Sequence, residues 1–186
     1  MTVPVPLLGI SGSLRRGSHN TAVLRSLATL LQGQAELRIF ALDEIPPYNA
    51  ELDGEAPPLP VQALKAAITQ ARGLVICSPE YNYGMPGVLK NALDWASRPG
   101  YQSPLKDKPA LIMTASPGAF GGARAQSQIR EVLSATLARP IARQHVAIPV
   151  VHQKFSEGHL VDEVTAQFLR EAAADLLAEV ALLARR

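Results

Sequence analysis

The residues best suited to chemistry lie at positions 79–87, where the sequence reads Pro-Glu-Tyr-Asn-Tyr-Gly-Met-Pro-Gly. This stretch has one carboxylate, Glu80, and neither histidine nor cysteine, so it lacks the side chains of a protein acid–base pair. Its two tyrosines and many backbone N–H groups suit a flat aromatic ligand with polar edges. The stretch therefore predicts a binding loop rather than a centre of protein acid–base catalysis.

Two further polar loops have features of ligand-binding segments. Residues 11–20 precede a helical pattern, so hydroxyl and N–H groups would gather at a helix N-terminus, where Arg15 adds a charge for binding a phosphate. A solvated turn in which Ser18 or Asn20 caps the helix explains the same residues. Residues 116–124 contain three glycines that let the backbone approach a ligand closely, although a plain flexible turn has the same composition.

The loop at 11–20 does not match better-known motifs. It lacks the Gly-Lys-Ser/Thr ending of a Walker loop, and glycines at positions 9, 12 and 17 do not form the dinucleotide fingerprint. Ser13 stands where a nucleophile elbow needs its second glycine. These differences disfavour both ATP hydrolysis and serine hydrolysis.

Each of the three loops follows an apolar stretch of strand character and leads into a helical pattern. Strands are predicted at 5–10, 35–42, 74–78, 109–115 and 143–151, and helices after residue 20 and at 61–71, 88–95, 126–137 and 162–186, with Gly73 ending the second helix. Because strands and helices alternate, the sequence predicts an α/β fold with a mostly parallel sheet covered on both faces. In the strand order 2-1-3-4-5, the three loops meet at one end of the sheet.

The Pro-rich segment 43–60 has two interpretations. It is either a bare connector or a wall of the site that carries Tyr48 and Asn49. His145 and His152 are isolated in sequence, which favours surface or core positions over metal binding.

The predicted helix 88–95 is apolar over more than half its girth, with Lys90 and Asp94 spaced to pair. Such a helix would pack on the sheet and also meet a second subunit, unless Trp95 is simply a core residue.

Composition sets further limits. A chain of 186 residues suits one domain over 1–186, and a net charge of +2 without a Lys/Arg cluster disfavours nucleic acid as a partner. The single cysteine, Cys77, excludes a disulfide framework and favours a buried, inert thiol. The sequence has neither a run of about 20 apolar residues to enter a membrane nor a signal peptide. We therefore expect a cytoplasmic protein.

The three loops resemble those of the NADPH-dependent FMN reductase family, particularly its quinone- and chromate-reducing members. The resemblance rests on Gly12-Ser13-Leu14-Arg15 with Ser18 and Asn20, on residues 79–87 followed by Lys90, Asn91, Asp94 and Trp95, and on Ser116-Pro117-Gly118 with Gly121, Gly122 and Arg124. It covers essentially the whole chain. The family implies a flavodoxin-like three-layer sandwich around a five-stranded parallel sheet in the order 2-1-3-4-5.

The resemblance also implies the cofactor and its ligands. The FMN phosphate would be held by the first loop, through Ser13, Leu14, Arg15, Ser18 and Asn20. The isoalloxazine would be lined by Pro79, Glu80, Tyr81, Asn82, Tyr83 and Gly84, with Asn82 at its polar edge. Ser116, Gly118 and Gly121 would close the other side. The chemistry would be centred on the flavin, without a catalytic side chain or a metal.

The family further implies a ping-pong oxidoreductase in which NADPH or NADH is the electron donor and a quinone, chromate or free flavin is the small-molecule acceptor. Family members are usually homodimers or homotetramers. Arg124 would contact the nucleotide phosphates or cap its helix. The alternatives are an azo-dye or organoarsenical reductase of the same superfamily, and an FMN electron carrier or redox sensor, which Arg15 disfavours.

Overall fold

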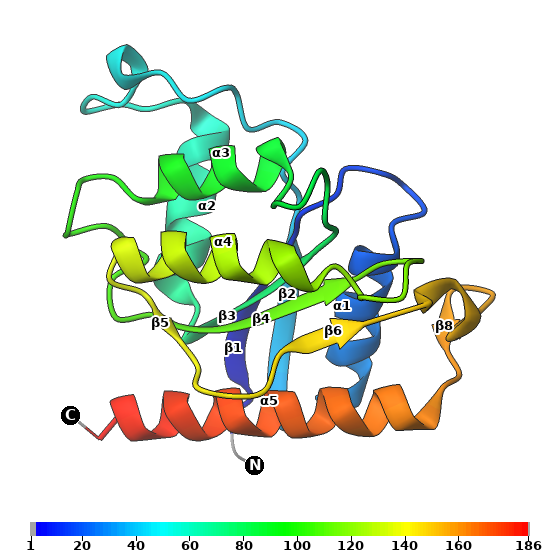
Figure 1. Cartoon of the computed structure of the whole chain (residues 1–186). Coiled ribbons are helices and arrows are strands. Elements are labelled where there is room, and N and C mark those ends of the chain that lie inside the picture. Colours follow the sequence, from blue (N-terminus) through cyan, green and yellow to red (C-terminus); the bar gives the residue numbers. More distant parts are fainter. Residues whose placement is uncertain (1–2, 186) are drawn as a thin grey trace.

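The computed structural model describes residues 3–185, which form a central sheet with helices on both faces (Figure 1). The strands are β1 (Val5–Ser11), β2 (Ala35–Phe40), β3 (Gly73–Ser78), β4 (Pro109–Ala115), β5 (Arg139–Pro140), β6 (Val146–Ile148), β7 (Phe155–Ser156) and β8 (His159–Leu160). The helices are α1 (His19–Leu30), α2 (Leu59–Gln70), α3 (Gly87–Ala96), α4 (Ala123–Ala135) and α5 (Glu163–Leu183), with 3₁₀ turns η1 (Ala50–Leu52) and η2 (Val151–Gln153). No helix in this described part of the chain is both long and apolar enough to cross a bilayer.

The predicted α/β fold and strand order are confirmed. Strands β2, β1, β3 and β4 pair in parallel in that order, so that Leu7 of β1 faces Leu37 of β2 and Gly73 of β3. The fifth position is shared by β5 and β6, which both pair in parallel with β4. In this flavodoxin-like order, the loops after β1, β3 and β4 leave the same end of the sheet, at the right of Figure 1.

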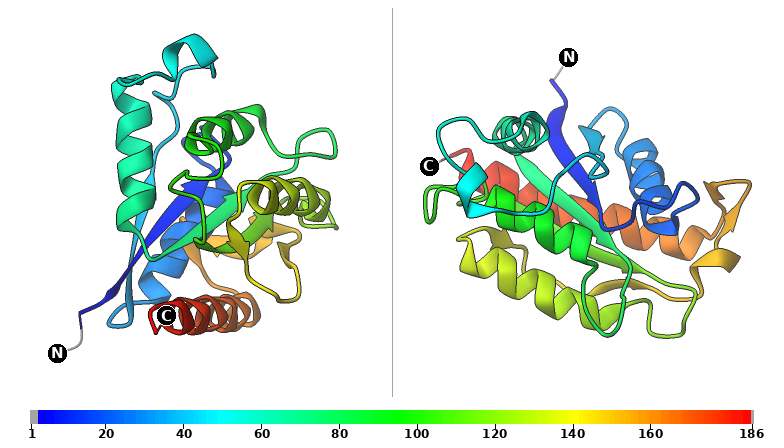
Figure 2. Two further views of the ribbon diagram at one scale, coloured as in Figure 1. Left: turned by 90° about the vertical axis from the view of Figure 1, so that its left-hand side faces the viewer. Right: turned by 90° about the horizontal axis from the view of Figure 1, so that it is seen from above.

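The two faces of the sheet have separate apolar cores. Helices α1 and α5 cover one face, and α2, α3 and α4 cover the other (Figure 2). Side chains of β3 alternate between them: Val75 and Cys77 join the first core, and Leu74 and Ile76 join the second. All four are fully buried, as expected for a central strand of a parallel sheet. The unbroken apolar run in β3 therefore reflects burial on both sides.

The predicted strand at 143–151 is wrong in its bounds. Strand pairing covers only β6 and the separate short strand β5. Between them the chain leaves the sheet, and Arg143 Nη1 donates to Asp175 Oδ2 of α5 at 2.8 Å. Val150, with a φ of 49°, then starts the turn η2. The edge of the sheet is thus an interrupted strand held partly by a helix.

The predicted role of Gly73 and the predicted start of the fourth helix are also wrong. Helix α2 ends before Ala71, whose backbone is extended, and Gly73 is the first residue of β3. A Cβ on Gly73 would lie 3.2 Å from both Leu7 Cδ2 and Val180 Cγ2, so close packing explains this glycine. Helix α4 begins at Ala123, directly after Gly122.

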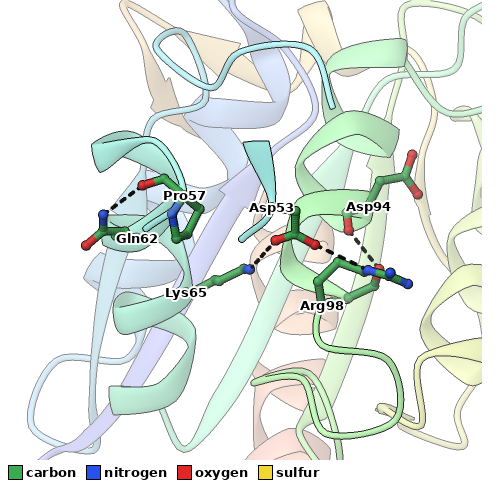
Figure 3. Close-up of polar contacts among 7 residues, drawn as sticks. Asp53, Pro57, Gln62, Lys65, Asp94 and Arg98 are labelled. Atoms are coloured by element: carbon green, nitrogen blue, oxygen red, sulfur yellow. Dashed lines mark hydrogen bonds and ion pairs between the residues drawn. The ribbon is translucent and has the colours of Figure 1, made fainter. Parts of the chain in front are cut away.

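The Pro-rich segment 43–60 is fastened to α2 and to the segment after α3 (Figure 3). The carboxylate of Asp53 is only 9% exposed and pairs with Lys65 at 3.1 Å and with Arg98 at 3.3 Å. Gln62 Nε2 donates to the Pro57 carbonyl at 2.7 Å. These contacts hold the segment as an ordered strap.

Residues 46–49 pack against α3. Trp95 is fully buried, and its Nε1 donates to the Pro46 carbonyl at 2.8 Å, so Trp95 is a core residue. Tyr48 packs edge-on against the indole, with ring centroids 4.8 Å apart. Asn49 accepts the Glu51 N–H at 3.0 Å and caps η1. Tyr48 and Asn49, which the sequence suggested as a wall of the site, therefore make their contacts with α3 and within the strap, respectively.

Candidate active site

The loop after β1 bends closely around the end of β3. The Gly12 N–H donates to the Cys77 carbonyl at 2.9 Å, which continues the pairing of the two strands. A Cβ on Gly12 would stand 2.3 Å from Ser78 Oγ, so glycine is required at this approach. The close packing fixes where the loop begins.

Ser18 ends this loop as the N-cap of α1, accepting the Thr21 N–H at 3.3 Å. Within residues 3–185, no hydrogen bond engages the backbone N–H groups of Arg16, Gly17, His19 or Asn20. These donors lie at the positive end of the α1 dipole, where an anion is favoured. The loop therefore has the geometry of a phosphate site in addition to the predicted cap.

The side chains of the segment 13–15 face outward. Ser13 Oγ accepts the Arg15 N–H at 3.3 Å, and Leu14 is 54% exposed. Ser13, Leu14 and Arg15 line a groove of about 450 Å³ whose other wall is the segment 39–43. The lining of this groove includes none of residues 79–84 or 116–121. The three side chains therefore line a groove whose lining does not include the other two loops.

Asn20 is only 4% exposed, and its amide bonds to groups inside the protein. Its Nδ2 donates to the Ala115 carbonyl at 3.1 Å, while its Oδ1 accepts the Ala115 N–H at 3.0 Å and the Cys77 thiol at 3.3 Å. The side chain therefore ties α1 to the ends of β3 and β4. An anion at this loop would meet the backbone N–H of Asn20 rather than its amide.

The loop after β3 contains a tight two-residue turn. Tyr81 and Gly84 exchange two backbone hydrogen bonds, of 2.9 and 3.0 Å, around Asn82 and Tyr83, whose φ values are 50° and 67°. Positive φ at both central positions is typical of a hairpin turn and is strained for tyrosine. Tyr81 and Tyr83 are 55% and 69% exposed. The turn thus presents two aromatic rings to the exterior.

Pro79 and Glu80 precede this turn, and Glu80 caps α4. Gly122, the N-cap residue, has no side chain, and Glu80 Oε2 instead accepts the Arg124 N–H at 2.9 Å. Glu80 Oε1 also lies 3.6 Å from Arg124 Nη1. A carboxylate at a helix N-terminus is stabilised by the unpaired N–H groups and the helix dipole. Glu80 therefore joins the loop after β3 to the loop after β4.

Arg124 lies in the first turn of α4 and stacks on exposed aromatic rings. Its guanidinium carbon is 4.3 Å from the centroid of Tyr83 and 5.5 Å from that of Phe120. Phe120 is 73% exposed. The cap of α4 is made by Glu80 and by the backbone N–H of Arg124, so the guanidinium itself is not the cap. Whether it binds a nucleotide phosphate stays a prediction.

The loop after β4 is ordered against β6. The Ser116 N–H donates to the Ile148 carbonyl at 3.1 Å, and Ser116 Oγ accepts the Gly118 N–H at 3.1 Å. Gly121 has a φ of 60°, and a Cβ there would lie 2.8 Å from the Ile148 nitrogen. Glycine thus lets the loop close onto β6. The loop is therefore a turn closed by hydrogen bonds, in which Gly118 is exposed.

Two titratable groups beside these loops have shifted pKa values. Complete burial raises the pKa of the Cys77 thiol, which keeps it protonated and unreactive, as predicted. Partial burial lowers the pKa of His19, with further contributions from the nearby charges of Arg15 and His152. His19 is therefore neutral at neutral pH, in a region of positive potential.

Contacts within the chain thus join the three loops at one end of the sheet. Two contributors were missed from the sequence. The first is Gln128, whose Oε1 accepts the Met85 N–H at 3.0 Å and lies where a Cβ on Gly84 would stand. The second is Thr21, whose Oγ1 donates to Ser11 Oγ at 2.8 Å. The spacing of four residues between Arg124 and Gln128, on one helix face, was the available signal for Gln128.

A sequence profile of the family described as NADPH-dependent FMN reductase matches residues 5–153, a segment that contains all three loops. The chain belongs to the NADPH-dependent FMN reductase family. An NAD(P)H-dependent FMN reductase of Pseudomonas aeruginosa is 38% identical over 172 residues, which cover 92% of each chain. A quinone reductase of Escherichia coli strain K12 is 38% identical over 173 residues, covering 91% of this chain and 92% of the relative.

A solved structure agrees with this membership. The flavoenzyme FerB, an NAD(P)H:(acceptor) oxidoreductase from Paracoccus denitrificans, superposes with a TM-score of 0.85 at 32% identity, covering 92% of this chain and 95% of FerB. The chain is therefore an enzyme of the NAD(P)H-dependent FMN reductase and quinone reductase family, with the flavodoxin-like fold that its strand order predicted.

Proposed function

We propose that this family member binds FMN across the loops after β1, β3 and β4 and transfers two electrons from NADPH or NADH to a quinone-type acceptor. The observation that carries the proposal is the set of unpaired backbone N–H groups at the start of α1, tied by Asn20 to the ends of β3 and β4. Such donors suit a phosphate. The quinone reductases among the relatives support the choice of acceptor.

The residues of the first loop fit an FMN phosphate. Arg16, Gly17, His19 and Asn20 would donate their backbone N–H groups, and Arg15 would supply a charge-assisted bond. The approach of Gly12 to Ser78 leaves no space for a side chain between this loop and β3, so close packing fixes the path of the loop where it leaves β1.

The isoalloxazine would lie between the turn 81–84 and the loop 116–121. The exposed rings of Tyr81 and Tyr83 would cover part of it, and backbone N–H groups of both loops would meet its polar edge. When bound, FMN supplies the two-electron redox chemistry that links the nicotinamide donor to the acceptor. The side chains of the turn and of loop 116–121 include no histidine or cysteine. The role of these loops would therefore be to bind and orient the flavin and its substrates.

An absorbance spectrum of the purified protein, before and after anaerobic addition of NADPH, tests the proposal. We expect flavin bands that bleach with the nucleotide and return with a quinone, and parallel double-reciprocal lines when both substrates are varied. Bands that ignore NADPH and NADH would favour a carrier or sensor. Re-oxidation by azo or arsenical compounds but not by quinones would change the acceptor, and protein that cannot take up FMN would refute the cofactor.

A double variant tests the phosphate site. Ser13→Ala with Arg15→Ala should weaken FMN binding, because each removes a contact to a charged group worth about 1.5–3 kcal/mol. Arg72→Ala is the matched control, because Arg72 precedes β3 at the opposite end of the sheet. Unchanged FMN retention in the double variant would show that the phosphate lies elsewhere.

We also propose that the enzyme is a homodimer or homotetramer in which a second copy covers the open side of the site. Tyr81, Tyr83 and Phe120 are all more than half exposed there, which is unusual for large aromatic residues in one region. Sedimentation at micromolar concentration should give a species larger than the monomer, and a monomer would contradict this part of the proposal.

A further inference from the structure

The loops after β3 and β4 carry one accessible charge. Residues 79–87 and 116–124 contain two charged side chains, Glu80 and Arg124. The carboxylate of Glu80 caps α4 and is 15% exposed, whereas the side chain of Arg124 is 53% exposed. A ligand that enters between these two loops would therefore meet a cation.

The guanidinium of Arg124 is held in place, but its hydrogen-bond donors are unused. Its carbon lies 4.3 Å from the ring centroid of Tyr83 and 5.5 Å from that of Phe120, and Nη1 lies 3.6 Å from Glu80 Oε1. Cation–π contacts use the charge of the group and require no hydrogen bond from its N–H groups. Among the hydrogen bonds within residues 3–185, none is donated by this guanidinium. The N–H groups are thus available to a ligand.

The aromatic rings beside the guanidinium favour a flat ligand. Tyr81, Tyr83 and Phe120 are each more than half exposed, so they offer ring faces or edges to a second ring. A guanidinium is a planar fork of donors that matches two oxygens held side by side. A planar ring with two adjacent oxygens and a negative charge would satisfy the rings and the cation together.

Some quinones have this chemistry and others do not. A quinone with a hydroxyl beside one carbonyl is a vinylogous carboxylic acid, so it is ionised at neutral pH and has two adjacent oxygens at its edge. A quinone without such a hydroxyl offers neutral carbonyl oxygens. Hydrogen bonds to an ionised acceptor are roughly twice as strong as those to a neutral one. An arginine beside the acceptor therefore distinguishes the two classes.

We propose that Arg124 binds the paired oxygens of ionised hydroxyquinones, so that the enzyme takes these anions as electron acceptors. The inference rests on the proposed function, which names a quinone-type acceptor but leaves its charge open. Glu80 fixes the backbone of Arg124 at the start of α4, which places the guanidinium beside the proposed flavin site. A second copy over this side would exclude water and strengthen the attraction between the guanidinium and the anion.

Steady-state kinetics of the FMN-loaded enzyme with two naphthoquinones test the proposal. Lawsone has a hydroxyl beside one carbonyl, and its methyl ether has nearly the same shape but cannot ionise. In Arg124→Gln, the ratio of kcat/KM for lawsone to kcat/KM for the ether should fall about tenfold, the loss expected for one charge-assisted hydrogen bond. Arg124→Lys keeps the charge without the fork, so the ratio should fall less.

Arg38→Gln is the matched control. Arg38 is an exposed arginine that also lies beside a glutamate, Glu36, but it is part of the edge strand β2. Removing its charge should leave the ratio unchanged. An unchanged ratio in Arg124→Gln, or equal losses for lawsone and its ether, would overturn the role of Arg124. A fall in kcat/KM for NADPH with an unchanged ratio would assign the guanidinium to the nucleotide instead.

A titration without an electron donor separates this inference from the proposed function. Calorimetry of the oxidised protein should show that Arg124→Gln weakens the binding of lawsone about tenfold and weakens the binding of the ether much less. Equal weakening of both would overturn the inference while leaving the proposed function in place. Absence of flavin bands would instead overturn the proposed cofactor, and the titration would still measure whether Arg124 binds the anion.

Discussion

Replacing Asn20 with alanine separates two roles that the sequence and the structure assign to this residue. The family resemblance makes Asn20 a ligand of the FMN phosphate, whereas its amide is bonded to both polar groups of Ala115 and to the Cys77 thiol. We expect Asn20→Ala to lower the free energy of unfolding substantially and to leave the affinity for FMN nearly unchanged.

The magnitude follows from the groups left behind. The variant strands a buried N–H and a buried C=O of Ala115, and each unmade hydrogen bond costs about 1–3 kcal/mol. The thiol is a weak donor, so its loss adds little. A water entering the vacated polar space would restore part of the bonding, and we therefore expect a net loss of about 3 kcal/mol.

Urea unfolding with and without saturating FMN measures both quantities. A bound ligand stabilises the folded state according to its affinity, so FMN should raise the stability of wild type and variant by the same increment. Asn49→Ala is the matched control, because it removes only the cap of the exposed turn η1 and should cost about 1 kcal/mol or less. A loss for Asn20→Ala no larger than that of the control, or an FMN increment that disappears, would refute the reasoning.

Three further predictions concern single sites. Gly12→Ala should cost about 1–3 kcal/mol in urea unfolding because the new Cβ overlaps a hydroxyl, whereas Gly17→Ala, with nothing within 4 Å, should be nearly neutral. Hydrogen bonds from Thr165 lower the pKa of Asp162, the N-cap of α5, so the stabilisation by its charge is present above its ordinary pKa of 3.8 and is lost as the pH falls through the lower folded value. Asp162→Asn should thus be less stable than wild type at about pH 7 and equal to it at about pH 2 in thermal unfolding. Cys77 should react with an aromatic disulfide reagent only on unfolding, and rapid labelling of the folded protein would contradict its burial.

The local pattern of apolar residues was sufficient to predict the central strands but not the strand at the edge of the sheet. Strands β3 and β4 are buried on both faces, so their sequences are continuous apolar runs with one interpretation. The edge position is divided between β5 and β6, and in the segment between them Arg143 pairs with Asp175 of α5. That attraction acts between residues 32 positions apart, so no short window of sequence contains it.

The positions of the site loops were predictable from the strand order, but the contacts between them were not. Glu80 caps a helix that begins beyond residue 120, and its bond to Arg124 spans 44 positions. The bonds of Asn20 to Ala115 span 95 positions. A polar residue in a binding motif has the same local pattern whether it faces a ligand or another loop. Sequence reasoning therefore predicted that the three loops lie at one end of the sheet, but it could not divide their residues between binding and support.

The strained turn at Asn82 and Tyr83 is supported by contacts from outside the turn. A two-residue hairpin turn needs positive φ at both central positions, which asparagine tolerates and tyrosine adopts at a cost of about 1–2 kcal/mol. Burial does not offset that cost, because the ring of Tyr83 is 69% exposed. The ring instead lies 4.3 Å from the guanidinium of Arg124, which Glu80 holds in place. A turn held by these contacts would need less ordering when a flat ligand stacks beside Tyr83, so binding would lose less free energy to ordering the loop.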